Sequence, residues 1–446
     1  MGKIGAFATV LLTACVLSFK IWGAEFYIDS LATPGGTGSV SAPFKSIQEG
    51  LNVLKAGDTL YVRGDPAGSG RIYLETLIFR VSGVDGSPIT VRSFPGEKVI
   101  VSTAETIVLD RDFLVIKGFI FDHQKAETDA IRWTGNNIHL SDCEVRNGSH
   151  DGIDASAQAK NVTISNCAVH DFVWVAPTRR DAHCIIANPG VIGFRIRGNT
   201  IYNCSGDGVH LFATDSTRVA DYVKDVLIEK NKIYSTLGGD SENGLDFKGG
   251  VNVTVRQNDI YGFTQNKAVV VQKGAKNLRL EENRIHDSAR GVEFRWEAGN
   301  FQYNITVTRN VFFNITGQYA LKFDGVVEAR VVNNTFHNSV GNSIRVEQKG
   351  IIGGIIKNNL INLSGAPRIS GRLAADHSHN GWFRSSAGSL TSSQDIIGTD
   401  PLFVDTAAKD FRLTSRSPAR DKGIDVGFPF MGEAPDLGCY ESANTQ

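Results

Sequence analysis

Apolar and polar residues alternate in short segments along most of this chain, and the pattern returns about every 25 residues. The clearest copies are Val226–Tyr234, Val253–Tyr261 and Leu278–His286. They place an asparagine at one shared position, at Asn231, Asn258 and Asn283. Alternation with a period of two predicts β-strands, because a helix would repeat its apolar positions every three or four residues.

The shared asparagine position continues on both sides of these copies. Earlier repeats are expected to place Asp142, Asn166 and Asn199 there, and later repeats Asn310, Asn334 and Asn359. A unit of this size cannot bury its apolar face alone, so successive units must stack into a solenoid. Asparagine tolerates tight turns, and its side chain can bond the backbone of neighbouring coils. We therefore predict an all-β fold, a right-handed parallel β-helix (solenoid) with an N-terminal helix cap.

The pattern divides the chain into four parts. They are a signal peptide (residues 1–24), an N-terminal cap with the first coils (25–110), the β-helix coils with the asparagine ladder (111–365), and C-terminal coils with a second cap (366–446). In the first cap, Ser46 precedes a predicted helix over Ile47–Leu54. The helix would cover the open end of the solenoid, where backbone groups are otherwise unpaired.

A second repeated phrase follows each asparagine turn, and it predicts a charged surface. Asn243-Gly-Leu-Asp-Phe-Lys248 is matched by Arg290-Gly-Val-Glu-Phe-Arg295. Side chains alternate across a strand, so Asp246 and Lys248 should face outward. Stacking the coils predicts one outer column of Arg132, Asp154, His210, Asp246, Val270, Glu293, Lys322 and Arg345. A neighbouring column holds Thr134, Ser156, Phe212, Lys248, Gln272, Arg295, Asp324 and Glu347.

Two repeats are longer than the others, and their extra residues flank this charged surface. Asn166 to Asn199 spans 33 residues, with the excess at 172–181, and Asn199 to Asn231 spans 32, with the excess at 213–225. Loops that lengthen on one face of a regular scaffold commonly carry function. Trp174, Arg179 and Arg180 in the first loop are therefore expected to contact a substrate.

The amino terminus predicts export. Lys3 is followed by the apolar run Ile4–Phe19, which is too short for a confident membrane span, and cleavage is expected near Ala24. We expect a secreted or periplasmic protein, with a lipoprotein anchored through Cys15 as the alternative. The net charge of −1 gives no reason to expect nucleic acid as a partner. A monomer without a membrane span is expected.

The cysteines leave one pairing open. Cys143 and Cys167 occupy the same position in adjacent coils, where strands lie about 4.8 Å apart, so they could be stacked thiols or a disulfide. Cys184, Cys204 and Cys439 lack the spacing of metal ligands, and no zinc site is predicted from them.

The charged columns suit an acidic polysaccharide, whose sugar units repeat every ~5 Å, close to the rise per coil. Cleavage by β-elimination needs a base for the proton α to the carboxylate, and Lys248 is the first candidate. The candidate catalytic residues are Lys248, Arg295, His210 and Asp246. The candidate substrate-binding residues are Arg132, Arg179, Arg180, Trp174, Glu293 and Lys322. Asp154, Asp181, Asp207 and Glu242 are candidate calcium ligands, since calcium takes about six to eight oxygens.

Several segments resemble secreted β-helix proteins. Residues 25–62, Gly86–Ser93 and residues 399–441 resemble parts of polysaccharide lyases and their relatives, and the phrase ending in Asp246-Phe-Lys248 is similar to pectate-lyase-like lyases of families six and nine. This resemblance implies a strand-borne lysine as base. It also implies calcium held by neighbouring aspartates in family nine and an assisting arginine in family six, a role that Arg295 can take.

Two other functions remain open. A glycoside hydrolase needs two carboxylates, and Asp246 and Glu293 lie two coils apart, at ~10 Å, near the range of inverting enzymes. A non-catalytic carbohydrate-binding or adhesin β-helix would keep aromatic residues for sugar stacking and would not need Lys248.

Overall fold

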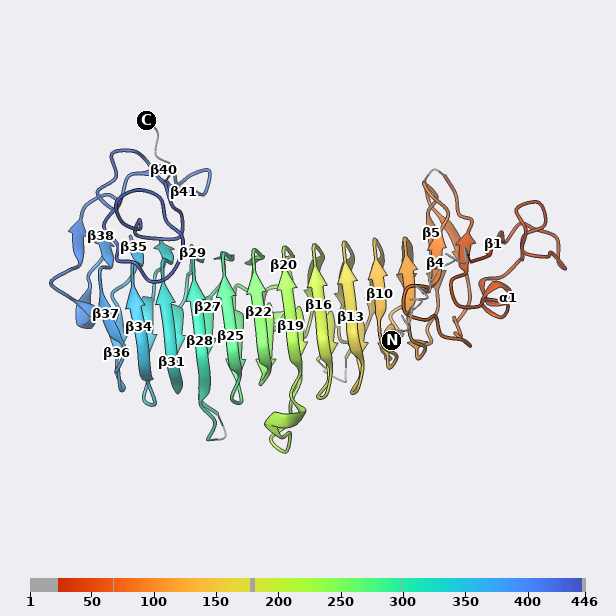
Figure 1. The fold of residues 1–446 in the computed structure, drawn as a ribbon, viewed down its shortest axis with the longest axis horizontal. Helices are drawn as coiled ribbons and strands as arrows, with labels where there is room; N and C mark the ends of the chain where they lie inside the picture. The colour runs from red at the N-terminus through yellow and green to blue at the C-terminus, as the bar shows by residue number, and fades with distance from the viewer. Residues whose placement is uncertain (1–22, 67, 177–180, 298, 443–446) are drawn as a thin grey trace, which may run out of the picture.

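The computed structural model describes residues 23–66, 68–176, 181–297 and 299–442, and it is a right-handed parallel β-helix. Three long parallel sheets of 14, 14 and 11 strands form its faces, and along most of the solenoid each coil adds one strand to each sheet (Figure 1). The fold class predicted from the alternating pattern is confirmed. Most of the predicted signal peptide, residues 1–22, lies outside the described residues, as do Cys15, Arg179 and Arg180. In the described part of the chain, no helix is long and apolar enough to cross a membrane.

The first sheet contains β1 (Glu25–Ile28), β2 (Thr59–Val62), β4 (Ile89–Ser93), β7 (Leu114–Lys117), β10 (Ile138–Ser141), β13 (Lys160–Ser165), β16 (Ile192–Arg197), β19 (Lys224–Glu229), β22 (Val251–Arg256), β25 (Lys276–Glu281), β28 (Gln302–Thr308), β31 (Val326–Val332), β34 (Ile351–Lys357) and β37 (Asp376–Ser378). It runs unbroken across residues 110–111, because β4 pairs with β7. The first coils are therefore continuous with the repeats that follow.

The second sheet contains β3 (Arg71–Tyr73), β5 (Val99–Ser102), β8 (Phe119–Asp122), β11 (Glu144–Gly148), β14 (Ala168–Phe172), β17 (Thr200–Cys204), β20 (Lys232–Tyr234), β23 (Asp259–Tyr261), β26 (Arg284–His286), β29 (Val311–Phe313), β32 (Thr335–His337), β35 (Leu360–Asn362), β38 (Gly381–Phe383) and β39 (Ile396–Gly398). Its outward residues form a stacked aromatic column, in which the rings of Tyr202, Tyr234 and Tyr261 lie nearly parallel with centroids 5.0 and 5.1 Å apart. His286 and Phe313 extend this column.

The third sheet contains β6 (Ile107–Leu109), β9 (Ile131–Trp133), β12 (Ile153–Ala155), β15 (Ile185–Ala187), β18 (Val209–Leu211), β21 (Leu245–Lys248), β24 (Lys267–Gln272), β27 (Arg290–Phe294), β30 (Tyr319–Phe323), β33 (Asn342–Val346) and β36 (Arg368–Ile369). Inward side chains such as Leu245 and Phe247 are fully buried in one core that runs the length of the solenoid. Burial of these apolar side chains is the main stabilising term of the fold.

The asparagine ladder is confirmed from Asn199 onward. From Asn231 onward, each asparagine accepts, through its Oδ1, hydrogen bonds from the backbone N–H and the Nδ2 of the asparagine in the preceding coil, as between Asn258 and Asn283 at 3.0 and 2.9 Å. Asn199 Oδ1 accepts from the backbone N–H of Cys167. The prediction for Asp142 and Asn166 is wrong by one residue. These two residues lie at left-handed turn positions, with φ of 52° and 54°, and Cys143 and Cys167 occupy the ladder position instead.

The cysteines of the ladder are free thiols, and the disulfide lies elsewhere. The backbone N–H of Cys143 donates to Cys167 Sγ at 3.4 Å, so the second cysteine takes the role of an asparagine oxygen. Burial raises the pKa of the Cys143 thiol. Cys184 and Cys204 form a disulfide, which the sequence analysis did not predict.

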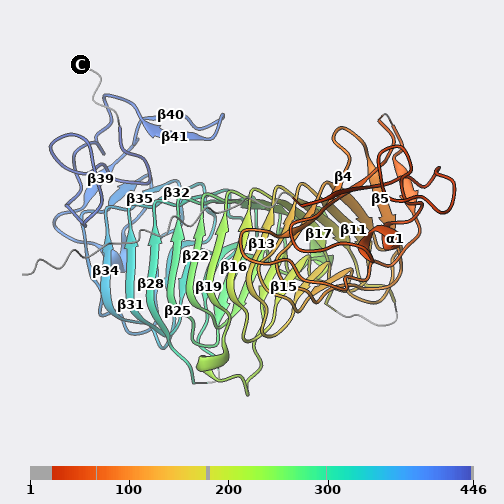
Figure 2. The same cartoon turned by 45° about the vertical axis from the view of Figure 1, so that its right-hand side comes forward.

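Both ends of the solenoid are covered. Helix α1 (Ile47–Leu51) begins at Ser46, whose side chain accepts a hydrogen bond from the N–H of Glu49, and it ends three residues earlier than predicted. At the other end, the hairpin β40 (Phe403–Asp405) and β41 (Asp410–Leu413) folds back over the outer face of the second sheet (Figure 2). There Phe411 packs on Phe313. Short 3₁₀ helices lie at η1 (Val219–Asp221), η2 (Gly238–Asp240) and η3 (Gly388–Leu390).

Candidate functional site

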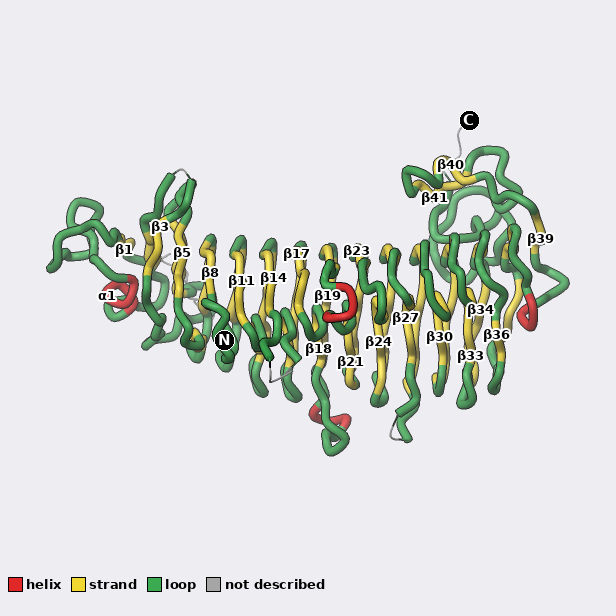
Figure 3. The backbone as a smooth tube through the Cα atoms, turned by 180° about the vertical axis from the view of Figure 1, so that it is seen from behind, coloured by secondary structure: helices red, strands yellow, loops and turns green. Residues whose placement is uncertain are grey.

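Strands β18, β21, β24, β27, β30, β33 and β36 of the third sheet follow one another along the solenoid (Figure 3). Their outward column has the register predicted from the repeats. His210 pairs with Asp246, Asp246 with Val270, and Val270 with Glu293. The one addition is Ile186, which lies between Asp154 and His210. The burial of the column differs from expectation, because His210 is 1% exposed and Asp246 is 4% exposed. These side chains face outward, but neighbouring polar side chains bury them, so they are not exposed to solvent.

A buried cluster of two imidazoles and one carboxylate lies at the centre of the column. His210 Nδ1 lies 2.6 Å from Asp207 Oδ2, and His183 Nδ1 lies 3.5 Å from the same oxygen. The rings of His183 and His210 contact each other, with centroids 4.4 Å apart. Asp207 is fully buried, and burial opposes its ionisation, but the hydrogen bonds and charges of His210, His183 and Asn243 together lower its pKa to about 2. Burial lowers the pKa of His183 to about 3, so this imidazole is neutral.

The same residues form a second side-chain ladder, at the start of the third sheet. The backbone N–H of His183 donates to Asp151 Oδ1 at 2.9 Å, and that of Asp207 donates to His183 Nδ1 at 2.8 Å. The backbone N–H and Nδ2 of Asn243 donate to Asp207 Oδ1 at 3.0 and 2.9 Å. Buried backbone groups must be paired, and this ladder pairs them in each coil.

Asp246 joins this cluster to the solvent-facing side of the sheet. Its carboxylate accepts hydrogen bonds from Gln272 Nε2 at 3.0 and 3.2 Å, and its Oδ2 lies 4.0 Å from His210 Nδ1. Lys248 Nζ lies 4.0 Å from the same Oδ2, with the lysine side chain 27% exposed. Burial, with the charge of Asp207, raises the pKa of Asp246 to about 6. Lys248 is therefore the member of this group that a substrate can reach.

An acidic pocket of about 360 Å³ lies beside the cluster. It is lined by Trp174 and Asp181 from the first long loop and by Glu242, Asn243 and Lys267. Burial, with the charges of Asp207 and Asp181, raises the pKa of Glu242 to about 7. The sequence analysis expected the loop at 172–181 to flank the charged surface, and Trp174 and Asp181 of this loop line the pocket.

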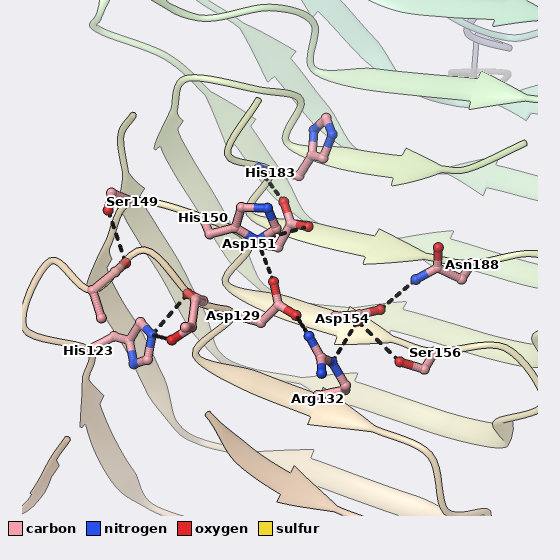
Figure 4. A network of polar contacts seen from close by, with 12 residues as sticks. His123, Asp129, Arg132, Ser149, His150, Asp151, Asp154, Ser156, His183 and Asn188 are labelled. Atoms are coloured by element: carbon pink, nitrogen blue, oxygen red, sulfur yellow. Dashed lines mark hydrogen bonds and ion pairs between the residues drawn. The ribbon is translucent and has the colours of Figure 1, made fainter. Parts of the chain in front are cut away.

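A second network continues the polar surface toward the N-terminus (Figure 4). Asp129 Oδ1 lies 2.5 Å from His150 Nδ1, and Arg132 bridges Asp129 and Asp154. Asp154 also accepts hydrogen bonds from Asn188 at 2.6 Å and Ser156 at 3.1 Å. The two oxygens of Asp154 are thus already occupied by protein donors.

The opposite end of the column holds Glu293 among cations. Its Oε1 lies 2.8 Å from Lys322 Nζ, and its Oε2 lies 2.9 Å from the Tyr319 hydroxyl and 3.7 Å from Lys267 Nζ. Burial opposes ionisation, but the hydrogen bond and charge of Lys322 keep the pKa of Glu293 below its usual value. Arg295 is exposed and lies two coils from Lys248 in the neighbouring column, as predicted.

A family model described as the Pel9A-like right-handed β-helix region matches residues 26–285, which include His183, Asp207, His210, Asp246 and Lys248. The chain belongs to the Pel9A-like right-handed β-helix family. A curated relative is the uncharacterized protein YwoF of Bacillus subtilis (strain 168), which is 22% identical over 467 residues, with 89% of this chain and 92% of YwoF covered.

Solved structures share the fold at low sequence identity. Pectate lyase Pel9A matches with a TM-score of 0.50 and 17% identity, with 94% of this chain and 96% of that chain covered. The PL6 family polysaccharide lyase Pedsa3628 from Pseudopedobacter saltans matches with a TM-score of 0.51 and 12% identity, with 83% and 94% covered. PL6 family alginate lyase AlyGC matches with a TM-score of 0.56 and 12% identity, with 85% of this chain and 57% of that chain covered. At these identities the matches show the shared architecture.

The calcium set predicted from the sequence is not assembled in this Pel9A-like chain. Calcium needs about six to eight oxygen ligands at 2.3–2.6 Å. Among the described residues, two groups of three side chains bring possible metal-ligand atoms within 4.8 Å of one another. One group is His183, Asp207 and His210, and the other is Asp129, His150 and Asp151. Of the four predicted ligands only Asp207 belongs to either group, and the other two ligand atoms of its group are imidazole nitrogens. The donor set at the cluster does not fit calcium.

Sequence reasoning missed His183, Asp129 and His150. His183 and Asp129 occupy the first position of the repeated phrase, the position of Asn243, but Cys184 and Ala130 replace the glycine that follows it. His150 lies one residue before that position. The signal that could have found them is the spacing to the next coil, since His183 lies 24 residues before Asp207. Another pocket of about 490 Å³, between the C-terminal segment and the second sheet, is lined by Arg284, Arg309 and Phe430 and lies away from this chemistry.

The buried carboxyl of Asp151 predicts how stability depends on pH. Burial raises the pKa of Asp151 to about 7, so between pH 4 and 7 the folded state holds a proton that the unfolded chain has lost. The free energy of unfolding should therefore fall as pH rises through this window. Asp151→Asn is expected to raise it by about 2 kcal/mol at pH 8 and to change it little near pH 4.

Urea unfolding at several pH values, with a metal chelator present, measures this effect. The exposed Asp85 provides the control, since Asp85→Asn should leave the pH dependence unchanged. An Asp151→Asn variant with the same pH slope as the parent protein would show that this carboxyl is ionised in the folded state.

Proposed function

We propose that this protein is a polysaccharide lyase that cleaves an acidic, uronate-containing polysaccharide by β-elimination, with Lys248 as the general base. Membership of the Pel9A-like family supports this, as do fold matches that include a pectate lyase and an alginate lyase. We also expect export, as the apolar amino terminus predicts, because such polymers lie outside the cell.

The observation that carries the proposal is the position of Lys248. It is the partly exposed cation at the edge of a buried cluster of Asp207, His210 and Asp246, and its Nζ lies 5.9 Å from the ring centroid of Phe212. His210, the other candidate base, is 1% exposed, so a substrate could not reach it without a rearrangement. Lys248 combines access with a fixed position on a strand.

The reaction needs a general base and a cation that binds the carboxylates of the substrate. In β-elimination the base takes the proton from the carbon next to the uronate carboxyl, a double bond forms, and the glycosidic C–O bond breaks, with the leaving oxygen gaining a proton. Unprotonated Lys248 Nζ would accept the first proton. Arg295, about 10 Å along the same column by strand spacing, would pair with carboxylates of the bound chain and orient it.

The alternative hydrolase receives less support from the geometry. An inverting hydrolase on this surface would use Asp246, with its raised pKa, as the acid and Glu293 as the base. Glu293, however, accepts hydrogen bonds from both Lys322 and Tyr319, and it is 5% exposed. A carboxylate held in this way is poorly placed to activate a water molecule.

A product assay distinguishes the candidate functions. Purified protein would be incubated with pectate, alginate and glycosaminoglycans, and both ultraviolet absorbance and reducing ends would be measured. Lyase action raises both signals together, because elimination leaves an unsaturated sugar. Reducing ends without absorbance would indicate a hydrolase, and binding without either signal would indicate a non-catalytic protein. Either result would overturn the proposal.

A further inference from the structure

We propose that His183, Asp207 and His210 form a site for one divalent transition-metal ion of the zinc class rather than for calcium. Each residue offers one ligand atom, and these atoms lie within 4.8 Å of one another. All three residues are buried, and His183 and His210 come from adjacent coils of the third sheet. The inference does not depend on the lyase proposal, because it concerns what the cluster binds and not what the chain cleaves.

The donor types select the metal. Zinc is bound by imidazole nitrogen and carboxylate oxygen at about 2.0–2.2 Å, and three protein ligands leave a position for water or substrate. Calcium and magnesium instead require a shell of oxygens, which two imidazoles cannot supply. The carboxylate of Asp246, with Oδ2 4.0 Å from His210 Nδ1, is the nearest further oxygen that could complete the shell.

An unsatisfied nitrogen gives an independent indication of a ligand. His210 is only 1% exposed, and its Nε2 is buried without a hydrogen-bond partner among the described residues. A buried polar atom without a partner is costly, and in native structures it commonly marks a site for an ion or water. His210 Nδ1 lies 2.6 Å from Asp207 Oδ2, so these two residues already bring possible ligand atoms together at one point of the cluster.

The backbone ladder alone does not account for these residue types. Asn243, in the next coil, donates to Asp207 through its backbone and amide. At the other turn, asparagines in eight successive coils make a complete ladder. Asparagine in place of His183 and Asp207 could bond the same backbone groups without bringing an ionisable pair into the core. Two imidazoles beside one buried carboxylate are therefore best explained by a ligand.

The test measures metal content and binding on the full-length protein, produced without a histidine tag. Protein stripped with a chelator would be dialysed against equimolar zinc and calcium, and the bound metals would be counted by mass spectrometry. We expect one zinc per chain, no calcium at this cluster, and a higher melting temperature with zinc, because a ligand that binds the folded state stabilises it.

Two variants and a control assign the binding to the cluster. His210→Gln and His183→Gln should each weaken zinc binding by about 100-fold or more in a calorimetric titration, while circular dichroism checks that the β-helix forms. The control is His170→Gln, which alters another buried imidazole that contacts carboxylates, on the second sheet. Absence of zinc from the parent protein, unchanged binding in both folded cluster variants, or calcium binding that is lost in them would each overturn the inference. If lyase activity is absent but zinc binds, the metal site stands and the proposed function fails.

Discussion

Replacing Lys248 by methionine is expected to lower kcat/KM for β-elimination by about a thousandfold, since general-base catalysis contributes between a hundredfold and ten-thousandfold. Methionine keeps much of the side-chain volume and removes the amine that would take the proton. The loss should appear mainly in kcat, because Lys248 acts on the reacting carbon rather than along the whole bound polymer. Initial rates on the preferred polymer, followed by ultraviolet absorbance, provide the measurement.

The variant should fold normally, because the Lys248 side chain is 27% exposed and its nearest charged partner, at 4.0 Å, is Asp246. Lys232→Met is a matched control, since Lys232 is an exposed lysine on the second sheet. If Lys248→Met retains more than about a tenth of the parental rate, another group must supply the base. His210 would then be the next residue to test, in protein prepared with and without zinc.

Replacing Asn283 by alanine is expected to lower the free energy of unfolding by about 3 kcal/mol or more. Asn283 Nδ2 donates to Val255 O and Asn310 Oδ1, both at 2.9 Å, and Asn283 Oδ1 accepts from the backbone N–H and Nδ2 of Asn258. Alanine would leave these buried donors and acceptors without partners. Denaturant unfolding followed by circular dichroism measures the effect.

A matched control for Asn283→Ala comes from a second, exposed row of asparagines. Asn277 Nδ2 donates to Asn252 Oδ1 at 2.9 Å, but the residue is solvent-exposed, so water can replace the lost bond. Asn277→Ala should cost about 1 kcal/mol, part of it because Asn277 has a left-handed backbone with φ of 55°. Equal losses in the two variants would contradict the role assigned to burial.

The sequence predicted the coil register because the repeat encodes it directly. Asn231, Asn258 and Asn283 share one position, and a slip of one residue would turn every buried side chain outward. The prediction failed at Asp142 and Asn166, where cysteine occupies the ladder position and the matching polar residue lies one place earlier. In these coils residue type was a misleading guide, and only the alternation of Val169 and its neighbours fixes the register.

The candidate site was predicted less completely than the fold. His210, Asp246 and Lys248 lie on the predicted face because strand alternation determines which side they occupy. Their burial could not be predicted, because it depends on what packs around them, such as His183 and Gln272. The Cys184–Cys204 disulfide was missed for a similar reason, since it joins different faces of the solenoid across a turn.

The aromatic column on the second sheet limits where a polymer can bind. Sugars stack on the flat faces of aromatic rings, but Tyr202, Tyr234 and Tyr261 cover one another's faces, so only ring edges and hydroxyls reach solvent. The stacked rings therefore help to hold successive coils together. A polymer bound by the proposed lyase would therefore not stack on this column of rings.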